Sequence, residues 1–130
     1  YKNFLQSRKF PKMLIPGEPE TLQKIQKELK DYFGDKATVF VSKPYFLEIL
    51  PANCGKGEAI LWLADYLKLN KERTMCFGDS MNDEDMIVKC AYGVCMENGL
   101  EAMKNAARFV TEKNNNQSGV GDFIESYVNL

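Results

Sequence analysis

The sequence predicts an α/β protein in which a small α+β unit precedes a parallel sheet with helical crossovers. Two observations lead to this fold class. Residues 1–51 read as strand, helix, strand and strand, whereas residues 52–130 alternate between helices and short apolar strands. Alternation of the second kind is typical of a parallel sheet, because parallel strands need a crossover between them. We therefore expect two domains, 1–51 and 52–130.

The elements of the first unit follow from apolar periodicity and from turn residues. An apolar segment at 12–15 precedes two prolines and a glycine, which predict a strand and then a turn. Pro19 suits the first turn of a helix, and apolar residues recur after it at three- and four-residue steps as far as Gly34. The runs 38–42 and 45–50 are rich in β-formers and predict an antiparallel hairpin.

The second unit is expected to open with a helix that buries one apolar face. That face would consist of Ile60, Leu63, Ala64 and Leu67. The elements expected after it are strands at 74–78, 92–96 and 109–110, and helices near 83–90, 100–107 and 120–127.

Composition and charge exclude several classes of function. Seventeen basic residues balance eighteen acidic ones, so the chain lacks the positive field that a nucleic acid or an anionic membrane requires. Its apolar runs are far shorter than the roughly 20 residues that span a bilayer. We therefore expect a cytoplasmic protein without nucleic-acid or membrane partners.

Cysteine and histidine usage restricts the chemistry further. The four cysteines lack C-x-x-C spacing and the chain has no histidine, which argues against a zinc site and predicts reduced, mostly buried thiols. The absence of histidine also removes Ser-His and Cys-His nucleophile pairs. Carboxylates, lysine and a metal ion remain as the groups that could carry out catalysis.

The segment 74–83 combines a buried strand with a cluster of carboxylates. Asp79 stands at the expected strand end, and Asp83 opens the next helix, so both carboxylates can reach one crevice beyond the sheet. Oxygen ligands of this kind suit Mg²⁺, which is usually held by one or two carboxylates together with a phosphate and water. The alternative is that Asn82-Asp83-Glu84-Asp85 only caps that helix, since these residue types are favoured at the N-cap and in the first turn.

A second candidate element is Gly55-Lys56-Gly57, directly before a helix. Glycines permit close approach of the backbone to a ligand, and the Lys56 ammonium could meet a phosphate oxygen. By itself, the tripeptide is more often a turn that carries a solvated lysine.

Together the two elements resemble the third and fourth motifs of the haloacid dehalogenase superfamily, in particular its Cof-type sugar-phosphatase branch. The lysine before a helix is followed, one helix later, by a strand and the sequence G-D-x-x-N-D. The likeness extends over nearly the whole chain, in order, through Gly17-Glu18-Pro19-Glu20, Pro44–Ile49, Lys56-Gly57, Phe77–Asp83 and Val110-Thr111.

The resemblance implies a fold and a set of roles. Residues 1–51 would be the later part of an α+β cap, and residues 52–130 the second half of a Rossmann-like core. Lys56 would neutralise charge on the transferring phosphoryl group, and Asn82 would contact the phosphate. Asp79 would ligate Mg²⁺ with support from Ser80, and Asp83 would orient Lys56 or assist the metal.

The family's nucleophile is an aspartate in a D-x-D motif on the first core strand, and no D-x-D-G-T-like sequence occurs in this chain. The D-x-D spacing of Asp83-Glu84-Asp85 follows the fourth motif and belongs on a helix, so we do not assign it as nucleophile. The resemblance thus implies a Mg²⁺-dependent phosphatase of small phosphorylated metabolites whose 130-residue part here is inactive alone.

A second hypothesis comes from a different class of function. A half-fold with an open sheet edge could act as a binding module for the missing first half or for another copy of itself. In the first unit, Tyr45, Phe46 and Glu48 could contact a substrate, but strand alternation equally allows them to be packing and exposed residues. The lysine-rich helix 24–36 is expected to present a solvated face.

Overall fold

The computed structural model describes residues 9–128, which divide into two compact units between Cys54 and Gly55. This division lies close to the expected boundary after residue 51. None of the helices within 9–128 has the length and apolar character needed to cross a membrane.

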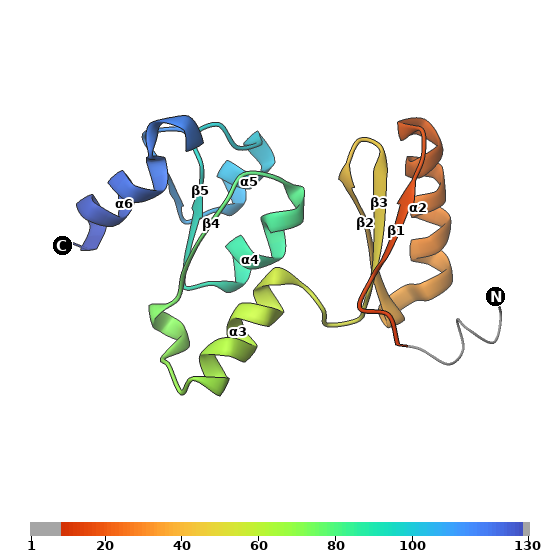
Figure 1. The fold of residues 1–130 in the computed structure, drawn as a ribbon, viewed down its shortest axis with the longest axis horizontal. Coiled ribbons are helices and arrows are strands. Elements are labelled where there is room, and N and C mark those ends of the chain that lie inside the picture. The colour runs from red at the N-terminus through yellow and green to blue at the C-terminus, as the bar shows by residue number, and fades with distance from the viewer. Residues whose placement is uncertain (1–8, 129–130) are drawn as a thin grey trace. The chain divides into compact units, whose positions relative to one another are not determined.

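The first unit is an antiparallel three-stranded sheet with one helix packed on it (Figure 1). Its elements are β1 (Met13–Pro16), α2 (Pro19–Phe33), β2 (Ala37–Lys43) and β3 (Phe46–Pro51). Strand β3 pairs with both neighbours, so the order is β1-β3-β2. The predicted hairpin is confirmed, with a register shift between Val41 and Lys43.

Helix α2 forms where the sequence predicted it, and its apolar stripe supplies the core of this unit. Pro19 is its first residue, and Gly34 follows its end with a φ of 51°, a left-handed conformation that favours glycine. Leu22 on α2 is 1% exposed. The side chains packed with it include Val39, Leu47 and Ile49 of the sheet and Ile25, Leu29 and Phe33 of α2.

The second unit contains a parallel sheet, as predicted, with strand order β4-β5-β6. Short 3-10 helices occur at Lys71–Arg73, Met81–Asp83 and Asn115–Gln117. The helices and strands are α3 (Lys56–Tyr66), β4 (Met75–Gly78), α4 (Glu84–Lys89), β5 (Tyr92–Cys95), α5 (Glu101–Ala106), β6 (Phe109–Val110) and α6 (Gly119–Val128).

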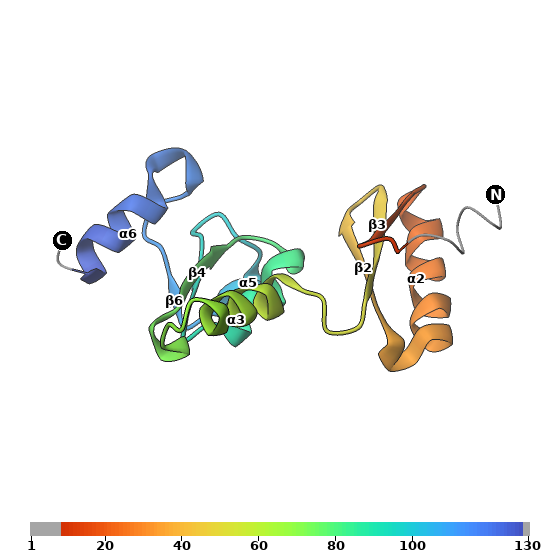
Figure 2. The same ribbon diagram turned by 60° about the horizontal axis from the view of Figure 1, so that its bottom comes forward.

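Different helices cover the two faces of this sheet. Cys76 of β4 and Cys95 of β5 are buried in a cluster with Ile87 of α4 and Met103 of α5. Phe77, the next residue along β4, points to the opposite face, where its ring centroid lies 5.7 Å from that of Phe123 on α6. Alternation along the strand therefore assigns α4 and α5 to one face and α6 to the other (Figure 2).

The predicted apolar face of α3 is only partly buried. Ala64 is buried and Ile60 packs against the core cluster, but Leu63 and Leu67 are 48% and 52% exposed. The prediction of one buried face was wrong because apolar residues surround this helix, and its principal contact with another α-helix among residues 9–128 is with α4. Trp62 and Tyr66 of α3 are also exposed, and their rings stack with 5.3 Å between the centroids.

Candidate active site

The candidate site begins at the carboxyl end of β4, where Gly78 leads into Asp79. Gly78 is required here because a Cβ atom at this position would come within 2.5 Å of the Asp83 Cβ atom. Asp79 is partly buried, and its carboxylate has no hydrogen-bond or ion-pair partner within the described part of the chain. The carboxylate is therefore available to a ligand beyond the strand end.

Asp83 connects the parts of the site. Its side chain is buried, with the residue 6% exposed. Oδ1 accepts a hydrogen bond from the Lys56 ammonium. Oδ2 accepts bonds from the backbone N–H groups of Asp79 at 3.1 Å and Ser80 at 3.4 Å. One carboxylate thus holds Lys56 beside the loop that carries Asp79.

These contacts decide the protonation of Asp83. Burial opposes the charged form, but hydrogen bonds from Lys56 and from the amides of Asp79 and Ser80 outweigh burial and lower the pKa below its ordinary value. Asp83 is accordingly a carboxylate that orients a cation and a loop. Ser80 and Asp83 also form a capping box, but it closes the 3-10 turn Met81–Asp83, and the Asp83 side chain makes no capping hydrogen bond to α4.

Lys56 is the first residue of α3, and the helix start places its ammonium on Asp83. Gly55 and Gly57 were expected to let a ligand approach the backbone closely. In this structure Asp85 of α4 occupies the space beside them. A Cβ atom on Gly55 would collide with Asp85 Oδ2, and one on Gly57 would lie 2.5 Å from the Asp85 carbonyl oxygen. The glycines allow α4 to approach the start of α3.

Asn82 lies in the 3-10 turn between Asp79 and α4. Its Oδ1 accepts a hydrogen bond from the Ser80 hydroxyl, which directs the donor side of the Asn82 amide away from Ser80. The side chain is partly exposed. An amide donor in this position can reach an anionic group at the strand end.

The loops that follow the other two strands reach the same edge of the sheet. The Leu100 N–H donates to the Asp79 carbonyl oxygen at 2.9 Å and ties the loop after β5 to the site. Thr111, 3% exposed, joins the loops after β5 and β6. Its Oγ1 accepts from the Glu97 N–H at 2.9 Å and donates to the Lys113 carbonyl oxygen at 2.7 Å. Hydrogen bonds therefore connect the loops after β4, β5 and β6 at the carboxyl edge of the sheet.

The oxygen ligands at this edge of the sheet fit one part of a magnesium site. They do not form a complete coordination shell by themselves. Among the described residues, no cluster of three acidic, cysteine or histidine side chains could hold a metal ion. Within residues 9–128 the Asp79 carboxylate has no partner, whereas both oxygens of Asp83 are engaged. One carboxylate ligand is compatible with Mg²⁺ when a phosphate and further oxygens complete the shell.

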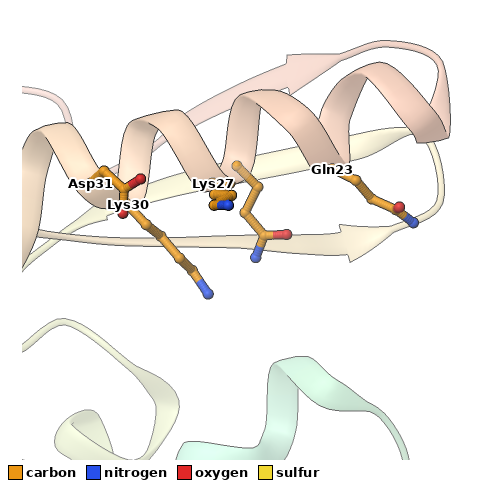
Figure 3. A pocket seen from close by; sticks show the side chains of 5 residues that line it. Gln23, Lys27, Lys30 and Asp31 are labelled. Atoms are coloured by element: carbon orange, nitrogen blue, oxygen red, sulfur yellow. The ribbon is translucent and has the colours of Figure 1, made fainter.

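Two surface hollows lie in the first unit and contain none of the predicted site residues. One lies along the side of α2 next to β2, where Gln26 Nε2 donates to the Val39 carbonyl oxygen at 3.5 Å, and is lined by Gln23, Gln26, Lys27, Lys30 and Asp31 (Figure 3). Its lining is polar, and Gln23, Lys27, Lys30 and Asp31 are exposed, as predicted for a solvated face, whereas Gln26 is half-buried. The other is apolar and includes Met13, Phe33 and Ile49.

The three residues of the first unit that were considered for substrate contact differ in environment. Tyr45 is 57% exposed in the hairpin turn, and Phe46 begins β3. The Glu48 carboxylate pairs with the Lys12 ammonium at 2.9 Å. This pair was not anticipated from the sequence.

Sequence reasoning also missed the contact of Asp85. Its Oδ2 accepts a hydrogen bond from the Gly57 N–H at 2.9 Å, so α4 reaches the start of α3 at a second point besides Asp83. The available signal was the D-x-D spacing itself, which was considered as a nucleophile motif and as part of a helix cap. Two carboxylates separated by one residue can contact one neighbouring helix start at two points.

Comparison with protein families matches residues 1–124 to the family of haloacid dehalogenase-like hydrolases. A relative from Streptococcus pyogenes is 40% identical over 117 residues, which is 90% of this chain and 43% of the relative. The 5-amino-6-(5-phospho-D-ribitylamino)uracil phosphatase YwtE of Bacillus subtilis is 35% identical over 82% of this chain and 36% of its own length. An HMP-PP phosphatase of Serratia proteamaculans is 36% identical over 72% of this chain and 34% of its own length.

Solved structures give the same likeness. A haloacid dehalogenase-like hydrolase from Bacteroides thetaiotaomicron is 34% identical and superposes with a TM-score of 0.74 over 97% of this chain and 48% of that protein. One from Bacillus subtilis is 26% identical, with a TM-score of 0.83 over 98% of this chain and 45% of that protein. The chain therefore spans less than half the length of the relatives and structures it matches.

Proposed function

Because the chain belongs to the haloacid dehalogenase-like hydrolase family, we propose that it is the second half of a phosphatase acting on small phosphomonoesters. Residues 1–51 would form part of the cap, and residues 52–130 the later half of the catalytic core. The Asp83 carboxylate that joins Lys56 to the Asp79 loop is the observation that carries this proposal. Relatives that bear the name of phosphatases support the reaction class.

In this proposal each polar group has a separate task. Lys56 and Asn82 bind the phosphoryl oxygens, and Asp79 with Ser80 contributes to the metal site. A bound Mg²⁺ would neutralise charge on the transferring phosphoryl group. Asp83 acts mainly as an orienting residue, since its oxygens already hold Lys56 and the amides of the Asp79 loop. These tasks rest on position and charge, which dominate phosphoryl transfer.

The substrate class proposed is a small phosphorylated metabolite, such as a sugar phosphate. The relative YwtE is named as a phosphatase of 5-amino-6-(5-phospho-D-ribitylamino)uracil, a small phosphorylated compound. The group that attacks phosphorus would be supplied by a part of the protein outside these residues, since the sequence has no D-x-D-G-T-like motif.

We expect the 130-residue chain to be inactive and the full-length product of its gene to hydrolyse an aryl phosphate in the presence of Mg²⁺. Both proteins are assayed side by side, with and without a chelator. Turnover by the isolated chain that depends on Mg²⁺ and disappears in the Asp79→Asn variant would contradict the proposal that the attacking group lies outside these residues. If the full-length product hydrolyses none of a panel of small phosphate esters, the proposed phosphatase function is wrong.

A second candidate function is that of a binding half-fold, and the exposed apolar side chains of α3 favour it. Trp62 is 64% exposed and Tyr66 71% exposed, beside Leu63 and Leu67. Such a continuous apolar surface is unusual on a monomer. We propose that the preceding part of the same protein covers it, because the matched relatives are more than twice as long as the part that aligns.

Sedimentation velocity of the isolated chain tests this surface. Without its cover, the chain is expected to self-associate at high concentration, and the double change Leu63→Glu and Leu67→Glu should restore a monomer. Tyr32→Glu is the matched control, since Tyr32 is 80% exposed on α2 and lies outside the α3 surface. A monomer at all concentrations before any substitution would argue against the docking surface.

A further inference from the structure

Asp85 lies in the first turn of α4, where its placement has an ordinary explanation. Acidic residues are favoured near helix N-termini, and Asp85 Oδ1 pairs with Lys89 four residues later at 2.5 Å. These interactions involve only one of its two oxygens. The other oxygen, Oδ2, accepts a hydrogen bond from the Gly57 N–H of α3 at 2.9 Å.

The start of α3 needs such an acceptor. The first N–H groups of a helix have no partner within it, and the residue before the helix usually provides a side-chain oxygen. That residue here is Gly55, which has no side chain, and no side-chain cap from it is present. Asp85 therefore supplies from α4 the acceptor that the local sequence lacks.

The two flanking glycines match this arrangement. Gly55 has an extended backbone, with φ −141° and ψ 173°, that any residue can adopt. Backbone conformation therefore does not demand glycine at this position. What a side chain would meet is the Asp85 carboxylate, because a Cβ atom on Gly55 would collide with Oδ2.

We propose that Asp85 is a positioning residue for Lys56: its carboxylate fixes the peptide next to Lys56 while Asp83 holds the ammonium. The peptide between Lys56 and Gly57 is thereby held by Asp85 in the first turn of α4, and the Lys56 Nζ by Asp83 directly before that helix. This inference rests on the proposed function, in which Lys56 binds the transferring phosphoryl group. A small shift of such a group can lower a rate by about 10²-fold.

Asp85→Ala in the full-length gene product is expected to lower kcat by about 10- to 100-fold, the range for residues that orient a catalytic group, with KM changed much less. Asp85→Asn keeps an acceptor oxygen and should recover most of the rate. Lys89→Met is the matched control, because it removes the pairs of Lys89 with Asp85 and Glu58 but leaves the Gly57 hydrogen bond. Equal losses in Asp85→Ala and Lys89→Met would overturn the proposal.

A double-mutant cycle separates positioning from a general loss of structure. Gly55→Ala should impair kcat as Asp85→Ala does, since the new methyl group displaces the carboxylate. In the Asp85→Ala background the space is vacant, so adding Gly55→Ala should cost little more. Additive losses would contradict a shared action through Oδ2.

Amide hydrogen exchange gives a readout that is independent of phosphatase activity. The Gly57 amide is expected to be protected in the unaltered protein and in Lys89→Met, and to exchange at least about tenfold faster in Asp85→Ala, as for an amide that loses its partner. The Lys56 Cε resonance should shift in Asp85→Ala and in Gly55→Ala. Unchanged Gly57 and Lys56 signals would overturn the positioning role even if the protein proved not to be a phosphatase.

Discussion

Replacing Asp79 with asparagine should reduce the Mg²⁺-dependent phosphatase activity of the full-length gene product by about 10²- to 10³-fold, the range for removing one charge-stabilising group. Asparagine keeps the shape of the side chain and removes its charge. The fold should be unaffected, because the Asp79 carboxylate has no hydrogen-bond or ion-pair partner among residues 9–128. The decisive measurement is the rate as a function of Mg²⁺ concentration.

The control for this prediction is Glu84→Gln, an equal change of charge at an exposed position in the first turn of α4. It should leave both the rate and the Mg²⁺ dependence unchanged. Unfolding in urea is measured for both variants, and their midpoints should agree with that of the unaltered protein. An Asp79→Asn variant that retains Mg²⁺-dependent turnover would remove Asp79 from the metal site.

Asp83→Ala is expected to have the larger effect on stability, about 2 kcal/mol in the free energy of unfolding, because it leaves donors unpaired in a buried place. The backbone N–H groups of Asp79 and Ser80 lose their acceptor, whereas Lys56, half exposed, can turn to water. Denaturant unfolding of the 130-residue chain measures this loss. Activity should fall as well, since Lys56 and the Asp79 loop are no longer joined.

A matched control exists on α6, where Asp122 pairs with Lys113. Both partners of that pair are exposed, so Asp122→Ala should cost much less stability than Asp83→Ala. Similar losses for the two variants would show that Asp83 is no more than an ordinary surface partner.

The pKa of Asp83 gives the same interaction a pH dependence. Because its pKa in the folded chain lies below the ordinary value of 3.8, the unfolded chain binds the proton more readily. The stabilisation is therefore fully present well above pH 3.8 and is lost as the pH falls below that value towards the folded pKa. Asp83→Asn should flatten this part of the curve of unfolding free energy against pH.

Much of the fold could be predicted because the determining interactions are local. Pro19 and Gly34 mark the ends of α2, and the spacing of its apolar residues fixes the face that it buries. The alternation of short strands and helices after residue 54 predicted a parallel sheet, and it is present. The exposure of Leu63 and Leu67 could not be predicted, because it depends on which elements pack against α3.

Some residues of the candidate site could likewise be predicted from local sequence, and others could not. Asp79 and Asp83 could be found from the sequence, since a carboxylate at a strand end and another at the next helix start lie within one short segment. Lys56 could be assigned only with the help of the family resemblance, because 27 residues separate it from Asp83. The resemblance itself is confirmed by the family match and by the superposed structures.

The sequence by itself determined the order of elements, the parallel sheet and the identity of the polar groups at its edge, because propensity, periodicity and motif spacing act over a few residues. Only the tertiary structure decided that Asp83 engages both of its oxygens, that the Asp79 carboxylate has no partner among residues 9–128, and that Asp85 caps α3 across the α3–α4 contact. The physical reason is that a hydrogen bond between segments about 30 residues apart depends on helix packing, which leaves no local pattern in the chain.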